Sequence, residues 1–122
     1  MLAVPYTKRP GYQEPGDRTS EGHAAMYLLE VLSGPLDGKT WTFDSEITIG
    51  RDDSVAQACL ALDRYVSRKH AHVRVDGDGV RLTDLESRNG TKVNGKPVTG
   101  DASLEIGVPF MVGRTVLRVT RL

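Results

Sequence analysis

The sequence of 122 residues predicts an all-β fold, a two-sheet antiparallel β-sandwich of about eleven strands preceded by a disordered N-terminal arm. From Met26 onward, short runs of β-branched, aromatic and leucine residues are interrupted by turn signals roughly every eight to twelve positions. No window of a dozen residues carries the apolar stripe of a helix. About ten short strands in a single open sheet would leave apolar faces uncovered, so two packed sheets are expected.

Residues 1–25 have a different composition from the rest of the chain. They include Pro5, Pro10 and Pro15, several glycines, balanced charges and few residues that could build a core. This composition is typical of a disordered arm. Residues 26–122 are expected to form one domain, because a chain of this size can bury roughly two-thirds of its unfolded surface.

The strands are expected where apolar or β-branched runs stand between turns. In chain order these ranges are 27–32, 40–44, 46–50, 59–62, 70–76, 79–85, 91–94, 96–98, 103–106, 109–113 and 115–121. Between the seventh and eighth ranges, Asn94-Gly95 is typical of a two-residue hairpin turn. The longer connections, 52–57 and 63–66, carry no pattern of their own, and loops of this kind at one end of a sandwich commonly hold the functional residues.

The segment "HAHVRV" shows the alternation of a half-buried strand. Ala71, Val73 and Val75 are predicted on the buried face, which leaves His70, His72 and Arg74 on the other.

Composition limits the function classes. Sixteen basic and sixteen acidic residues cancel, so no global field would draw the chain to nucleic acid or to an anionic membrane. The single cysteine, Cys59, cannot form an internal disulfide and is predicted to be a buried packing residue. Neither a long apolar run nor a signal-peptide pattern is present, so a cytoplasmic location is expected.

The stretch "YVSRKHAHV" at 65–73 raises three alternatives: a hydrolase, a metal site or a binding loop. A hydrolase is disfavoured because Ser67 and His70, three residues apart at a strand start, would leave opposite faces, and no Gly-x-Ser-x-Gly elbow occurs. A metal site is disfavoured because only His23 could join His70 and His72, and no carboxylate cluster stands at ligand spacing. A binding loop remains.

Two other stretches supply groups suited to an anionic peptide. Arg51 closes a predicted strand directly after Gly50, and its planar guanidinium suits phosphate or carboxylate. Asn89 precedes Gly90 in a predicted turn, and its amide can both donate to and accept from an extended backbone. Each signal is weak alone, since surface arginines and Asn-Gly turns are common.

The combination is specific. "IGR" at 49–51, "VSRKHAHV" at 66–73 and "LTDLESRNGTKVNG" at 82–95, in this order on a strand-rich chain, resemble a forkhead-associated (FHA) domain over residues 26–122. The resemblance implies an eleven-stranded sandwich that binds phosphothreonine peptides through loops at one end. It also implies a module with no catalytic residue, metal or cofactor.

The resemblance assigns roles to residues that match the family motifs. The phosphate-binding positions correspond to Arg51, Ser67 and Arg68, and the positions near the peptide backbone to Asn89 and Arg88. Those that shape the site correspond to Gly50, His70 and Gly90. A phosphoryl group brings about −1.5 to −2 charges and three acceptor oxygens, which suits this set of donors.

The expected partner is a phosphothreonine-containing protein in Ser/Thr kinase signalling. The arm is a second candidate ligand, because it contains Thr7 and Thr19 and some family members bind a phosphorylated segment of their own chain. Thr7 is favoured, since its stretched reach is about twice the roughly 25 Å available to Thr19. The alternative function is an FHA-like structural or assembly domain that acts independently of phosphorylation.

Overall fold

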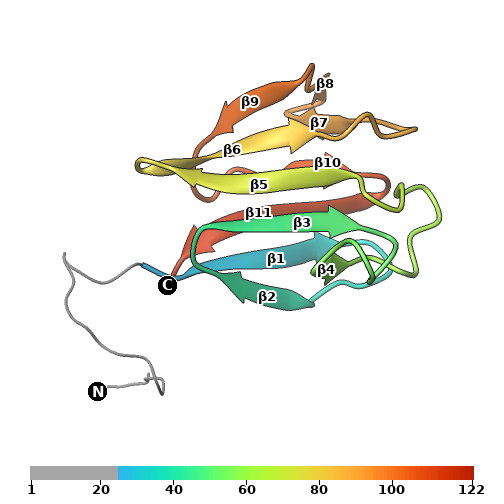
Figure 1. Ribbon diagram of the computed structural model, residues 1–122, viewed down its shortest axis with the longest axis horizontal. Coiled ribbons are helices and arrows are strands. Elements are labelled where there is room, and N and C mark those ends of the chain that lie inside the picture. The colour runs from blue at the N-terminus through green and yellow to red at the C-terminus, as the bar shows by residue number, and fades with distance from the viewer. Residues whose placement is uncertain (1–24) are drawn as a thin grey trace.

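The computed structural model describes residues 25–122, which form two packed β-sheets and contain no helix (Figure 1). The strands are β1 (Tyr27–Ser33), β2 (Thr40–Phe43), β3 (Glu46–Gly50), β4 (Ala58–Cys59), β5 (Ala71–Asp76), β6 (Gly79–Asp84), β7 (Thr91–Val93), β8 (Lys96–Pro97), β9 (Asp101–Leu104), β10 (Phe110–Val112) and β11 (Thr115–Arg121). The predicted all-β sandwich of eleven strands is therefore confirmed. No described segment forms a helix with the length and apolarity needed to cross a membrane.

The predicted arm lies almost wholly outside the described residues. Thr7 and Thr19 belong to that part of the chain. Ala25, the last residue assigned to the arm, is described, and it packs against the hydrophobic core.

The two sheets contain six and five strands. The six-stranded sheet has the order β2-β1-β11-β10-β7-β8, and the five-stranded sheet has the order β4-β3-β5-β6-β9. One pair departs from the predicted antiparallel arrangement, because β4 runs parallel to β3 at the edge of the smaller sheet. After β3 ends, the loop at residues 51–57 turns back and returns the chain to the side of β3. Strand β4 therefore runs in the same direction as β3.

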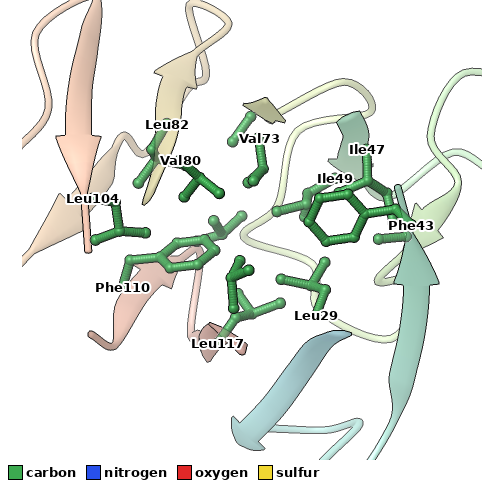
Figure 2. Close-up of a cluster of buried hydrophobic side chains, with 14 of the residues drawn as sticks. Leu29, Phe43, Ile47, Ile49, Val73, Val80, Leu82, Leu104, Phe110 and Leu117 are labelled. Carbon is green, nitrogen blue, oxygen red and sulfur yellow. The ribbon is translucent and has the colours of Figure 1, made fainter. Parts of the chain in front are cut away.

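The core lies between the sheets and is built by alternate residues of each strand. In both β1 and β11 the burial alternates between buried and half-buried positions, as expected for strands with one face on a core. Side chains from the two sheets meet in the middle, with Phe110 and Leu117 opposite Val73 and Leu82 (Figure 2). The rings of Tyr27 and Phe43 stack at one side, with their centroids 5.7 Å apart.

Some predicted positions differ from the structure. Strand β5 begins at Ala71, so His70 precedes the alternation and is fully buried, whereas it was predicted on the outer face. Val75 is only half-buried. Cys59 is also half-buried, because its Sγ lies at the sheet edge, 3.4 Å from the Arg51 carbonyl oxygen, while its neighbour Leu60 enters the core.

His72 lies on the outer face of β5 as predicted, and it has bonding partners there. Its Nδ1 is 3.1 Å from the Thr48 hydroxyl, and its Nε2 is 2.7 Å from a Glu46 carboxylate oxygen. These contacts join β5 to β3 across the face of the smaller sheet.

Two leucine substitutions test the location of the core. Leu29 has no exposed surface, whereas Leu62 is 67% exposed. We expect Leu29→Ala to lower the free energy of unfolding by about 2–5 kcal/mol, because it removes buried methyl groups and leaves a cavity. Leu62→Ala should change it by less than about 0.5 kcal/mol. Urea unfolding measures both, and similar losses in the two variants would contradict this core.

Candidate functional site

Three segments meet at one end of the sandwich. They are the end of β3, the loop at 63–69 before β5, and the loop at 85–90 between β6 and β7; in Figure 1 they lie at the end opposite the C-terminus. Together they form an open cleft of about 250 Å³. It is lined by Arg51, Arg64, Tyr65, Val66, Ser67, Arg68, Arg88 and Asn89.

The structure therefore brings together five of the residues that the sequence nominated for ligand contact. Arg51, Ser67, Arg68, Arg88 and Asn89 all line this cleft. The three nominated scaffold residues, Gly50, His70 and Gly90, are not among its lining residues, and their contacts are to the loops that form it.

Arg51 is anchored by both its backbone and its side chain. Its backbone N–H donates to the Ser67 carbonyl oxygen at 3.0 Å, and its Nε donates to the Val66 carbonyl oxygen at 2.9 Å. These bonds leave the two terminal nitrogens of the guanidinium group available. The fork is thus held at the cleft with donors that suit an anion.

Gly50 is required by the close approach of the loop to the end of β3. A Cβ atom at this position would lie 2.0 Å from the carbonyl oxygen of Arg68 and 2.8 Å from its carbonyl carbon. The backbone of the loop therefore passes directly over β3, and only glycine leaves room for it.

The side chain of His70 connects the loop at 63–69 to the loop at 85–90. Its fully buried ring accepts a hydrogen bond at Nδ1 from the Ser67 backbone N–H at 3.0 Å. Because Nδ1 is an acceptor, the proton of the neutral ring is on Nε2, which donates to the Gly90 carbonyl oxygen at 2.9 Å. Burial lowers the pKa of His70, and the hydrogen bond to Gly90 opposes that shift only in part.

Ser67 and Asn89 each use only part of their hydrogen-bonding capacity. The Ser67 hydroxyl oxygen accepts from the Arg88 backbone N–H at 2.9 Å, which leaves its proton free to donate. The Asn89 Nδ2 donates to the Tyr65 carbonyl oxygen at 2.8 Å, which leaves Oδ1 and a second amide hydrogen. Both residues can therefore contact a ligand without breaking these bonds.

The same contacts oppose a hydrolytic role for Ser67. A serine nucleophile needs a base that can take its proton. Both ring nitrogens of His70 are already bonded to backbone groups, and the bond to Ser67 is to its N–H and not to its hydroxyl.

Asp84 holds the loop at 85–90 together, a role the sequence analysis did not assign. Its Oδ1 accepts from the hydroxyls of Ser87 and Thr91, and its Oδ2 accepts from the Ser87 backbone N–H. The Ser87 hydroxyl oxygen in turn accepts from the Gly90 N–H at 2.9 Å. Aspartate and serine side chains commonly bond to nearby backbone groups in turns, so Asp84 and Ser87 could have indicated a turn at this place.

Asp63 ties the other loop to the opposite sheet. Its nearly fully buried carboxylate accepts from the Tyr65 N–H at 3.0 Å, the Arg114 N–H at 2.8 Å and the Thr115 hydroxyl at 2.7 Å. The Arg114 guanidinium also lies over the Tyr65 ring, 4.3 Å from its centroid. Sequence analysis missed Asp63, Arg64 and Tyr65, because their partners are distant in the chain or their side chains match no motif.

The cleft has a strong local charge in a protein whose net charge is zero. Four of its eight lining residues are arginines, and none is acidic. The neighbouring Asp52 accepts hydrogen bonds from Ser54, and these bonds, together with Arg68 and Arg51, lower the pKa of its carboxyl. The cleft is therefore suited to an anion.

Comparison with known proteins decides the family. The FHA domain of FhaA, solved in complex with the intracellular domain of another protein, is 34% identical, with a TM-score of 0.64 and coverage of 76% of this chain and 98% of that one. The chain belongs to the FHA domain family. Another FHA domain, from a structural and functional analysis of phosphothreonine-dependent FHA domain interactions, is 33% identical, with a TM-score of 0.66 and coverage of 78% and 95%.

Sequence comparison agrees with this assignment. The FHA domain-containing protein FhaB of Mycobacterium tuberculosis is 34% identical over 98 residues, which cover 80% of this chain and only 61% of that relative. A family model described as "Inner membrane component of T3SS, cytoplasmic domain" matches residues 30–121 of this FHA domain.

Two glycine substitutions test the geometry beneath the cleft. Gly50→Ala should destabilise the domain by about 1–3 kcal/mol, because the new methyl group overlaps the Arg68 carbonyl. Gly90→Ala meets no atom within 4 Å, and its cost of about 1–2 kcal/mol should come from the φ of +82°. Amide NMR shifts at residues 67–69 should change in the first variant and not in the second. Unchanged shifts in Gly50→Ala would contradict the close approach.

A pH dependence follows from His70. Its native pKa is lowered, so between that value and the ordinary value of about 6.5 the unfolded chain binds more protons. Its contribution to stability is therefore complete above about pH 6.5 and is lost as the pH falls below it. Urea unfolding at pH 7.5 and 5.5 should show this loss in the wild type and in His72→Gln, and a smaller loss in His70→Gln. Equal losses in all three would contradict the assignment.

Proposed function

We propose that this FHA domain is a non-catalytic interaction module that binds phosphothreonine peptides in its arginine-lined cleft. The observation that carries the proposal is the anchoring of Arg51: its Nε donates to the Val66 carbonyl oxygen, and Arg51 lines the same cleft as Ser67. A phosphoryl group, with about −1.5 to −2 charges and three acceptor oxygens, matches these donors.

The five cleft residues nominated from the sequence have distinct roles in this proposal. Arg51 and Arg68 neutralise the phosphate, and the Ser67 hydroxyl donates its free proton to a phosphate oxygen. Asn89 uses its remaining amide groups to hold the peptide backbone, with Arg88 beside it. Gly50, His70 and Gly90 keep the loops in place through the contacts already described.

The phosphate would be bound and not removed. His70 has no free nitrogen to activate a nucleophile, and the Ser67 hydroxyl oxygen already accepts a hydrogen bond. A module that binds phosphothreonine without hydrolysing it suits a partner phosphorylated by a Ser/Thr kinase. The similarity to an FHA domain from a study of phosphothreonine-dependent interactions supports this ligand class.

The chain's own arm is a second candidate source of phosphothreonine. Strand β11 starts at Thr115, which is bonded to Asp63 in the loop at 63–69. Strand β1 runs antiparallel to β11, so the start of β1 lies beside the end of β11, at the end of the sandwich away from the cleft. An arm ligand must therefore travel the length of a sheet, on the order of 20–30 Å. Thr7 is far enough from β1 to cover this distance, whereas Thr19 is at its limit.

The alternative proposal is an FHA-like assembly domain that acts without phosphate. The observation that favours it is the match of residues 30–121 to a family of secretion-system components. Its binding would be independent of both Arg51 and phosphorylation, so one experiment separates the two proposals.

Fluorescence anisotropy with labelled phosphothreonine peptides provides that experiment. We expect Arg51→Ala to weaken binding by about tenfold to a hundredfold, because one or more charge-assisted hydrogen bonds are lost. Arg74→Ala removes the same charge from the exposed face of β5 and should bind as the wild type does. Circular dichroism checks that Arg51→Ala is folded. Binding that is indifferent to Arg51→Ala and to dephosphorylation would favour the alternative.

A further inference from the structure

The cleft contains more positive charge than one phosphate requires. Its four arginines carry four positive charges, whereas a phosphothreonine brings about −1.5 to −2. The neighbouring Asp52 carboxylate, which interacts with Arg68 and Arg51, offsets about one of these charges, so about one positive charge would remain uncompensated after a phosphate had bound. Clustered like charges repel one another, so a ligand that brings a second negative charge is favoured over one that brings the phosphate alone.

The cleft arginines also differ from most other arginines of the domain. Outside the cleft, Arg81 pairs with Asp101, Arg118 pairs with Glu30, Arg114 lies over Tyr65, and Arg121 lies over Tyr27. In the cleft, Arg64, Arg68 and Arg88 are exposed, and across residues 25–122 none of their guanidinium groups forms an ion pair. Their charges are available to a ligand.

The four arginines fall into two pairs along the chain. Arg51 and Arg68 belong to the group around Ser67, since Arg51 is bonded to the carbonyls of Val66 and Ser67. Arg64 and Arg88 directly precede the two residues of another contact, in which Asn89 donates to the Tyr65 carbonyl oxygen at 2.8 Å, and the Arg88 backbone N–H also donates to the Ser67 hydroxyl oxygen. The second pair therefore accompanies the residue proposed to hold the peptide backbone.

We propose that Arg64 and Arg88 are specificity-determining residues that select peptides with a second anionic group next to the phosphothreonine. This inference rests on the proposed function and adds the ligand class to it. The second group is a carboxylate or a further phosphate, because both are acceptors that suit a guanidinium fork. Arg64 lies at a position to which the sequence analysis gave no role.

The test uses four labelled peptides of one length in fluorescence anisotropy. The first has phosphothreonine with neutral neighbours, the second has glutamates on both sides, the third replaces the glutamates with a second phosphothreonine, and the fourth is the glutamate peptide without phosphate. We expect the second and third to bind about threefold to tenfold more tightly than the first at low salt, and the advantage to shrink as salt is raised. The difference between the second and third identifies the preferred anion.

Variants assign the preference to the two arginines. In Arg64→Gln/Arg88→Gln, the second and third peptides should lose their advantage over the first, so the readout is the ratio of affinities and not the affinity for the first peptide. Arg74→Gln removes one positive charge from the outer face of β5, away from the cleft. In this control the second and third peptides should keep their advantage over the first. Unfolding in urea confirms that the variants are folded.

The outcomes separate this inference from the function on which it rests. Equal affinity for the first three peptides, or an advantage that persists in the double variant, overturns the inference and leaves phosphothreonine binding intact. If none of the three phosphopeptides binds better than the fourth, the proposed function fails and the inference fails with it.

Discussion

The binding end of this domain depends on one buried imidazole. His70 accepts from Ser67 on one side and donates to Gly90 on the other, and its own backbone joins β3 and the end of β6 through Ile49 and Leu85. Three separate pieces of the chain, namely the end of β3 and the loops at 63–69 and 85–90, are thus joined by one residue. Because the two ring bonds fit one neutral tautomer and the ring is buried, the arrangement favours the neutral ring and lowers the pKa of His70.

The positive charge of the cleft is positioned by that arrangement. A neutral protein presents an anion site only if its positive charge is local, and here four arginines share one cleft, while most other arginines within residues 25–122 are paired or stacked. At physiological salt, charges on exposed groups are screened beyond about 8 Å, so the distant faces of the sandwich contribute little to the potential at the cleft. The positive potential at the cleft therefore comes from the residues of its loops and not from the overall composition of the chain.

The sequence was sufficient for the fold and for the nominated cleft residues, because both depend on local information. Strand alternation needs only neighbouring residues, and Arg51, Ser67 and Asn89 stand in short motifs. The rest depended on contacts that no local pattern encodes. The partners of Asp63 lie some fifty positions away, at Arg114 and Thr115. The prediction placed His70 on the wrong face because the strand alternation starts only at Ala71. The parallel direction of β4 depends on the path of the loop at 51–57, which no local pattern encodes.

The bonds that shape the cleft run mainly from side chains to backbone groups: His70 to Ser67 and Gly90, Arg51 to Val66, and Asn89 to Tyr65. Backbone groups are present whatever the side chain at a position. Residues 64, 68 and 88 can therefore be exchanged with little cost to folding, as long as the anchoring residues remain. The charge and shape of the cleft surface can then be redesigned while the loops that form it keep one conformation.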